Sequence, residues 1–205
     1  MKPASVVLAL VFGLLPGSLA HAEPRSVAPF HAIEIAGTIE VTASISPTTK
    51  VEVLGDADHL KQVKTDVKNG TLVIDTVGDV RHARLRVVVS APSLDGLAIT
   101  GTGTLTATGL AGNSLGIHIP GTGEITLSGK ATKVALDIHG AGAVNAKELT
   151  TADANIDIQG TGEVSVHVDR SLVASISGTG AIKIHGKPTS IKRSITGVGV
   201  VKTAE

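Results

Sequence analysis

The sequence predicts an all-β protein, a parallel β-solenoid (β-helix-like) with coils of about 19 residues and an irregular N-terminal cap. Three observations carry this prediction. A Gly-x-Gly unit recurs at a nearly constant interval, apolar and polar residues alternate on both sides of each unit, and aromatic residues are almost missing. The 205 residues are 42% hydrophobic and 18% charged, which is too apolar for a disordered chain.

Composition excludes several classes of function. The chain has no cysteine, so disulfides, thiolate metal sites and thiol catalysis are ruled out. Lysine plus arginine equals aspartate plus glutamate at 18 each, so no net charge draws the protein to nucleic acid or anionic lipid. We therefore expect no nucleic-acid partner, no cofactor and no metal.

Residues 1–22 have the features of a cleaved signal peptide. Lys2 gives a positive start, residues 6–15 form an apolar run, and Ala20-His21-Ala22 matches the small-x-small cleavage pattern. We expect cleavage after Ala22 and a mature protein in the periplasm or secreted from a bacterium, without membrane insertion. The alternative is an uncleaved anchor, but a spanning helix needs about 20 apolar residues.

Residues 93–205 form the regular part of the same single domain. The first glycines of successive Gly-x-Gly units are 20, 19, 20, 18 and 19 residues apart. A fixed period of this length is typical of stacked repeat proteins. The twelve corner glycines are Gly101, Gly103, Gly121, Gly123, Gly140, Gly142, Gly160, Gly162, Gly178, Gly180, Gly197 and Gly199.

An isoleucine stands two residues before each first glycine, and alternation with a period of two continues on both sides of the corner. Such alternation predicts half-buried strands. Glycine suits the corner because it accepts positive φ and lets backbones approach closely. An antiparallel sandwich or barrel is the alternative, but it explains the recurring isoleucine less well. Stacked coils would place these side chains in one core ladder: Ile99, Ile119, Ile138, Ile158, Ile176 and Ile195.

Residues 23–92 are less regular and predict the N-terminal coils and cap of the solenoid. Apolar residues alternate around Gly37 as they do in the repeats, and Asn69-Gly70 predicts a tight turn between two strands. The 64 residues from Gly37 to Gly101 leave room for about three longer coils. The chain ends soon after Val201 with little to cover the last coil, so pairing with another subunit is a further expectation.

The order of four motifs resembles the head GIN domain family. These are Ile33 to Val41, Val51 to Asp56 and Asn69 to Ile74, followed by serial Gly-Thr-Gly units, so the resemblance covers roughly residues 28–201. Members are described as auto-transporter adhesins and otherwise as a domain of unknown function. The resemblance implies an exported β-solenoid and supplies no catalytic residue. Members often carry an acidic residue after the corner; Glu124 and Glu163 fit, whereas Thr104, Ala143, Ala181 and Val200 do not.

Two sets of outward residues are candidates for binding. Stacking predicts a cluster of His118, Asp137, His139 and Asp157 on one face. Adjacent aspartates repel unless a cation or histidine lies between them, so this cluster is either a weak metal or sugar site or a solvated face. The corner threonines either bond the local backbone, which we expect, or form a binding array for ice or a regular polymer. They are Thr102, Thr122, Thr161 and Thr179.

The sequence predicts that the protein is not an enzyme. Gly112 to Gly116 matches the nucleophile pattern Gly-x-Ser-x-Gly, but a strand and not a helix follows it. The most consistent function is a structural or adhesin-like binding module whose partner is an envelope or cell-surface component, or another copy. The alternative is a carbohydrate-active enzyme or a glycan-binding β-helix that uses the outward Asp and His columns.

Overall fold

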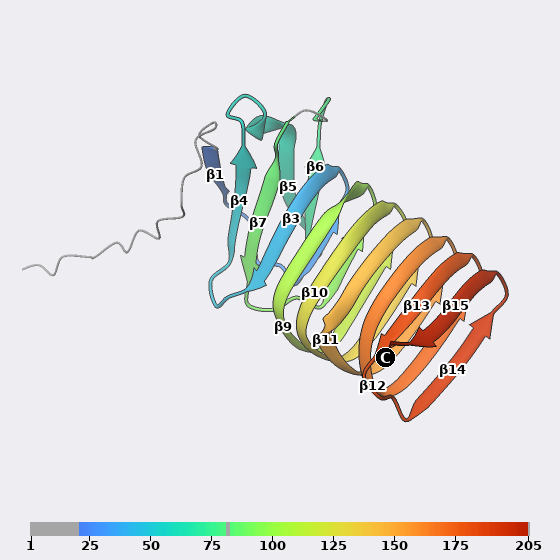
Figure 1. The fold of residues 1–205 in the computed structure, drawn as a ribbon. Helices are drawn as coiled ribbons and strands as arrows, with labels where there is room; N and C mark the ends of the chain where they lie inside the picture. Colours follow the sequence, from blue (N-terminus) through green and yellow to red (C-terminus); the bar gives the residue numbers. More distant parts are fainter. Residues whose placement is uncertain (1–20, 81–82, 205) are drawn as a thin grey trace, which may run out of the picture.

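The computed structural model describes residues 21–80 and 83–204 and shows one stack of β-coils (Figure 1). The predicted signal peptide lies outside the described residues except for His21 and Ala22, which begin the first strand, β1 (His21–Arg25). In the part of the chain that is described, no helix is long and apolar enough to cross a membrane.

The repeat region forms long curved strands that each pass from one Gly-x-Gly corner through a bend to the next corner. They are β9 (Thr102–Ile119), β10 (Thr122–Ile138), β11 (Ala141–Ile158) and β12 (Thr161–Ile176), followed by β13 (Thr179–His185), β14 (Ser190–Ile195) and β15 (Val198–Thr203). Equivalent strands of successive coils pair in parallel, and the register shifts only around the bends of the four long strands. The bends lie near Gly109 and Gly129, whose φ angles are 71° and 125°. The parallel solenoid prediction is therefore confirmed, and the antiparallel alternative is excluded for this region.

The N-terminal region combines parallel coils with antiparallel strands. Its remaining elements are β2 (Ala32–Ile35), β3 (Thr38–Ile45), β4 (Lys50–Gly55), the 3-10 helix η1 (Leu60–Gln62), β5 (Val63–Lys68), β6 (Thr71–Thr76), β7 (Arg86–Ala91) and β8 (Gly96–Ile99). The tight turn at Asn69-Gly70 is confirmed, because both residues have positive φ and join β5 to β6 as an antiparallel hairpin. Strand β4 pairs antiparallel with both β1 and β7, so these strands cover one end of the stack.

The coils do not stack in sequence order at this end. Strand β2 pairs with β6 on one side and β8 on the other, and β3 lies between β7 and β9. The corner at Gly101 thus rests directly on the corner at Gly37, with Thr102 N donating to Gly37 O at 3.0 Å. The prediction of about three intervening coils is wrong: β6 and β7 form one coil on the outer side of β2 and β3.

The interior is a column of aliphatic side chains. Ile99, Ile119, Ile138, Ile158 and Ile176 are each fully buried, and burial of one such side chain contributes about 1.5–3 kcal/mol. Ile195 departs from the expected ladder, because 43% of its surface is exposed. No described coil lies beyond β14 to cover it.

The first glycine of each corner is required by close approach of neighbouring coils and not by positive φ. All twelve are described, and none of them has φ in the left-handed region, so that part of the expectation is wrong. A Cβ atom built on Gly160 would lie only 2.0 Å from Gly140 O in the preceding coil. Thr161 N donates to the same oxygen at 2.9 Å, so the backbone itself fills the space that a side chain would need.

Candidate functional site

A continuous depression follows the glycine corner along the stack, and we call it the corner groove. It consists of three hollows of about 560, 340 and 700 Å³. The first begins at Ala36 and shares Thr102 with the second, and the second shares Ala141 and Gly142 with the third, which ends at Val200. In the second and third hollows the last glycine of each Gly-x-Gly unit lies between two outward rows, so no side chain covers the backbone there.

One wall of the corner groove is a row rich in threonine. Strand register aligns seven residues, one per coil: Thr38, Thr102, Thr122, Ala141, Thr161, Thr179 and Val198. All seven are exposed. Because paired strands are about 4.8 Å apart, the row places one residue at that spacing, and five of the seven residues carry a hydroxyl.

The threonine hydroxyls of this row have no hydrogen-bond partner among the described residues. The expectation that Thr102, Thr122, Thr161 and Thr179 bond the local backbone is therefore wrong. The carbonyl oxygen of the first glycine in each corner accepts an N–H group of the next coil at 2.9–3.0 Å. The hydroxyls are left facing solvent, where each can donate one hydrogen bond and accept others.

The opposite wall has seven aligned positions, and three of them are glutamates. The seven residues are Glu40, Thr104, Glu124, Ala143, Glu163, Ala181 and Val200. Lys183 Nζ donates to Glu163 Oε1 at 2.6 Å, and this hydrogen bond lowers the pKa of Glu163. Glu40 faces Arg86 at 3.8 Å. The wall therefore presents ionised carboxylates, which accept hydrogen bonds but cannot donate them.

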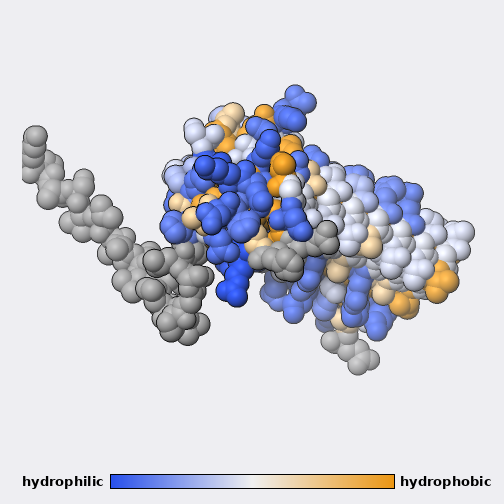
Figure 2. Space-filling model, turned by 90° about the horizontal axis from the view of Figure 1, so that it is seen from above, coloured by the Kyte–Doolittle hydropathy of each residue, from blue (hydrophilic) through white to orange (hydrophobic). Residues whose placement is uncertain are grey.

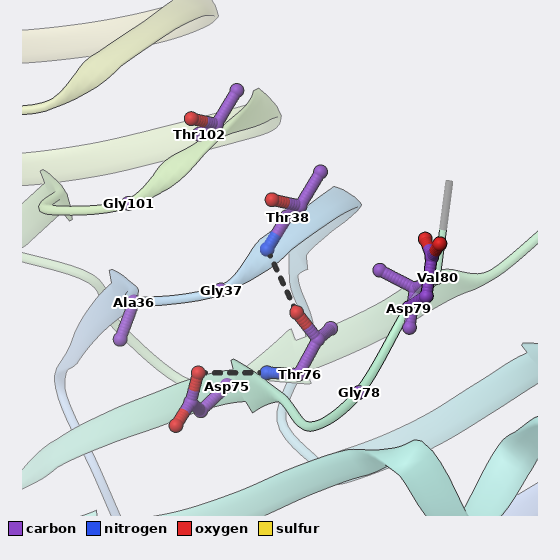
Figure 3. Close-up of a pocket in the computed structure, with 10 residues that line it drawn as sticks. All are labelled: Ala36, Gly37, Thr38, Asp75, Thr76, Gly78, Asp79, Val80, Gly101 and Thr102. Atoms are coloured by element: carbon purple, nitrogen blue, oxygen red, sulfur yellow. Dashed lines mark hydrogen bonds between the residues drawn. The ribbon is translucent and has the colours of Figure 1, made fainter.

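The N-terminal end of the corner groove is closed by the segment that follows β6 (Figure 3). Thr76 Oγ1 accepts a hydrogen bond from Thr38 N at 2.9 Å, and Asp75 Oδ1 accepts one from Thr76 N at 2.8 Å. Figure 3 shows Thr38 and Thr102 on successive strands, with Gly101 beside them. The Thr76 side chain is thus bonded to the backbone of β3, whereas Asp75 bonds within β6.

Strand register brings together the outward cluster predicted from the sequence. Asp137 pairs with His118 on one side and with Asp157 on the other. The rings of His118 and His139 meet edge to face with centroids 5.5 Å apart, and Gln159 Nε2 donates to Asp157 Oδ2 at 2.8 Å. No group of three or more His, Asp or Glu side chains within residues 21–80 and 83–204 has the geometry to hold a metal ion. Whether the cluster binds a ligand stays a prediction.

A separate hollow of about 520 Å³ lies on the C-terminal halves of strands β9 to β12. Its lining residues include Lys133, Asp153 and Val173. Arg170 holds Asp153 through two hydrogen bonds, one of them from Nε to Oδ1 at 2.8 Å. The hydrogen bond from Arg170 lowers the pKa of Asp153. Among the described residues, the two carboxylates with a lowered pKa are Asp153 and Glu163, and each belongs to a surface ion pair. Structural ion pairs also shift pKa values, so these shifts do not by themselves indicate a catalytic site.

From the sequence, the corner threonines were a binding array only as the alternative to backbone bonding, and the groove beside them was not predicted. The Gly-Thr-Gly units indicate a row of threonines beside glycines without side chains. The sequence pattern does not show whether the threonine hydroxyls bond to the backbone or face solvent. That depends on the strand register of the folded chain.

The fold and the groove define a protein class: a parallel β-solenoid with an unbroken outward groove and a covered N-terminal end. A family model described as "Putative auto-transporter adhesin, head GIN domain" matches residues 29–188. The chain belongs to this family, as the sequence resemblance predicted.

Two solved structures share the fold. A "putative adhesin" from Bacteroides fragilis has 22% sequence identity and a TM-score of 0.73, and the match covers 94% of this chain and all of that one. A "putative adhesin" from Parabacteroides merdae has 19% identity and a TM-score of 0.51, with 91% of this chain and 96% of that one covered. A comparison with curated proteins finds no match.

Proposed function

We propose that the protein is an exported, non-enzymatic, adhesin-like binding module of the cell envelope that holds an extended polymer along the corner groove. The observation that carries the proposal is the row of exposed threonine hydroxyls without a partner in the described chain. Family membership and the adhesin descriptions of the structural neighbours support the same role.

A polymer rich in hydroxyl groups, that is, a glycan strand, suits the chemistry of the groove. Threonine hydroxyls can donate to and accept from sugar hydroxyls, and the glutamates opposite accept from them. The described surface offers no tryptophan or tyrosine on which a sugar ring can stack. Affinity then comes from several weak hydrogen bonds made by the five threonines of the row, which spans about 29 Å at 4.8 Å per coil.

Blocking the groove tests this proposal. Ala141 is exposed and lies where the second and third hollows meet, so Ala141→Arg should obstruct the groove without entering the core. Ala111→Arg is the matched control, because Ala111 is also exposed on a strand but lines none of the three hollows. We expect the native protein and Ala111→Arg to bind glycan arrays or isolated cell-wall sacculi alike, and Ala141→Arg to lose at least about tenfold in affinity.

Two results would count against the groove. One is equal binding by both arginine variants, and the other is a failure of the native protein to bind any glycan strand or sacculus preparation. Circular dichroism melts of the three proteins show whether the comparison is between folded molecules.

The second candidate function is carbohydrate turnover by the outward cluster, and the register of Asp137 beside His118 and Asp157 favours it. Turnover of a glycan panel should then depend on the two aspartates. If Asp137→Ala and Asp157→Ala both abolish a measured turnover, this second candidate replaces the non-enzymatic proposal.

A further inference from the structure

The last coil ends the stack with open strand edges. Strand β14 pairs with β12 and β15 pairs with β13, and within the described chain neither strand has a neighbour on its outer side. At the other end, antiparallel strands cover the first coils. We call the outer side of β14 and β15 the C-terminal edge. Its backbone N–H and C=O groups are available to a further strand.

Apolar side chains gather at the C-terminal edge. The exposed fractions are 43% for Ile195, 75% for Val198 and 47% for Val200. Figure 2 shows apolar residues at the end of the repeat coils, next to a paler body. Ile176, which holds the position of Ile195 one coil earlier, is fully buried. A strand added to β14 would therefore bury the one open rung of the isoleucine ladder.

The same end is strongly basic. Residues 181–205 contain one acidic residue, Glu205, and five basic residues: Lys183, Lys187, Lys192, Arg193 and Lys202. Lys183 is paired with Glu163. The rest of the chain has 18 − 5 = 13 basic and 18 − 1 = 17 acidic residues, a formal charge of −4. A second copy docked end to end on this edge would bring like charges together, which costs free energy. An acidic partner would not.

Arg193 on β14 is a position where a negatively charged group of a partner could bind. It stands in register with the buried Ala174, at an inward position that earlier coils fill with Leu97, Ile117, Leu136 and Ile156. Its guanidinium is exposed and makes no side-chain hydrogen bond or ion pair with any described residue. Apolar Ile191 and Ile195 lie two residues to either side of it.

We propose that the C-terminal edge accepts an extended segment of another protein, which adds to β14 as a strand. The segment carries an acidic residue opposite Arg193 and apolar residues two positions before and after it. The acidic side chain pairs with the guanidinium, while the apolar residues cover Ile191 and Ile195. The order apolar, acidic, apolar at alternate positions is symmetric, so the segment can pair with β14 in parallel or antiparallel orientation. Main-chain hydrogen bonds supply affinity and the alternate side chains supply specificity.

Fluorescence anisotropy with synthetic peptides tests this proposal. The probe is a peptide of about eight residues that alternates valine with threonine and has glutamate at its central inward position. The matched peptide has lysine in place of that glutamate. We expect the purified protein to bind the glutamate peptide at least about fivefold more tightly, because one pairing is attractive and the other repulsive.

Charge reversal at Arg193 completes the test. Arg193→Glu should invert the preference and favour the lysine peptide, whereas Lys133→Glu, on the exposed surface of an earlier coil, should leave it unchanged. Arg193 is exposed, so the variant should fold, and a circular dichroism melt checks this. Equal affinity for the two peptides, no measurable binding of either, or a dimer in light scattering that excludes the peptide would overturn the proposal.

The C-terminal edge shares Val198 and Val200 with the corner groove, but the two proposals depend on different residues in their tests. Ala141→Arg should block glycan binding and leave peptide binding intact, and Arg193→Glu should do the reverse. Failure of one proposal is therefore distinguishable from failure of the other.

Discussion

The contact between stacked corners gives a quantitative prediction for Gly160→Ala. A Cβ atom at this position would be 2.0 Å from Gly140 O and 2.5 Å from His139 O. Real Cβ contacts are not shorter than 3.0 Å, so the two coils must separate by about 1 Å at this corner. The hydrogen bonds from Thr161 N to Gly140 O, 2.9 Å, and from Gly160 N to Ile138 O, 3.2 Å, would then be lost or severely lengthened.

The expected cost follows from those contacts. Each lost hydrogen bond is worth about 0.5–1.5 kcal/mol, and the displaced rung also loses packing, so the free energy of unfolding should fall by about 2–4 kcal/mol. Gly180→Ala should cost less, because its nearest obstacle, Gly162 O, is 2.7 Å away. Gly116→Ala is the matched control: its nearest atom is 3.8 Å away and its φ is not positive. A stabilisation of about 0.4–1 kcal/mol is expected there.

Urea unfolding followed by circular dichroism measures this series. The reasoning requires the order Gly160→Ala, Gly180→Ala, Gly116→Ala from most to least destabilising. If the first and last variants differ by less than about 0.5 kcal/mol, or if the order is reversed, close approach of the coils is not what demands glycine at the corner.

Three further predictions concern the core, an ion pair and export. Ile158→Asp should lower the free energy of unfolding by more than about 3 kcal/mol because it buries a carboxylate, whereas Ile195→Asp at the open end should lower it by less than about 1 kcal/mol. Thermal melts compare the two variants. Equal melting temperatures would contradict the position of Ile195 at the end of the ladder. The pKa of Asp153 is lowered in the folded state by Arg170, so the contribution of this pair is present above the ordinary aspartate pKa of about 3.9 and is lost as pH falls through the lowered value. Arg170→Ala should therefore lower the melting temperature at pH 7 and have a smaller effect near pH 3; a deficit that is equal at both pH values would show that the pair is not its source. Expression in a bacterium and mass spectrometry of the protein recovered from the periplasm should give a chain that begins after Ala22, and an intact N-terminus found only in the cytoplasm would refute export.

Sequence periodicity was sufficient for the architecture of the repeat. Side chains point alternately in and out of a strand, so a column of isoleucines at a constant offset from each glycine corner fits parallel strands in register. The same register placed Asp137 between His118 and Asp157, as their spacing predicted. These features are local to each coil and repeat, which is why a single chain displays them several times.

The N-terminal region was harder because its contacts are not local. Nothing in the residues between Gly37 and Gly101 states that β6 and β7 lie outside β2 and β3 and not between them and β8. Strands with the same alternating pattern can pair on either edge of a coil, and the choice depends on the length and path of the connecting segments.

The sequence by itself determined that the protein is a stack of coils with glycine corners and an aliphatic interior. Both the alternation of apolar and polar residues and the interval between the Gly-x-Gly units are visible in the sequence. The tertiary structure decided which surfaces are available. The corner threonines are exposed because strand register places them on the outward side of each coil, where their hydroxyls have no partner among the described residues. Ile195 is exposed, although it obeys the same pattern as its buried counterparts, because burial depends on a neighbour beyond the last coil and not on the residue itself.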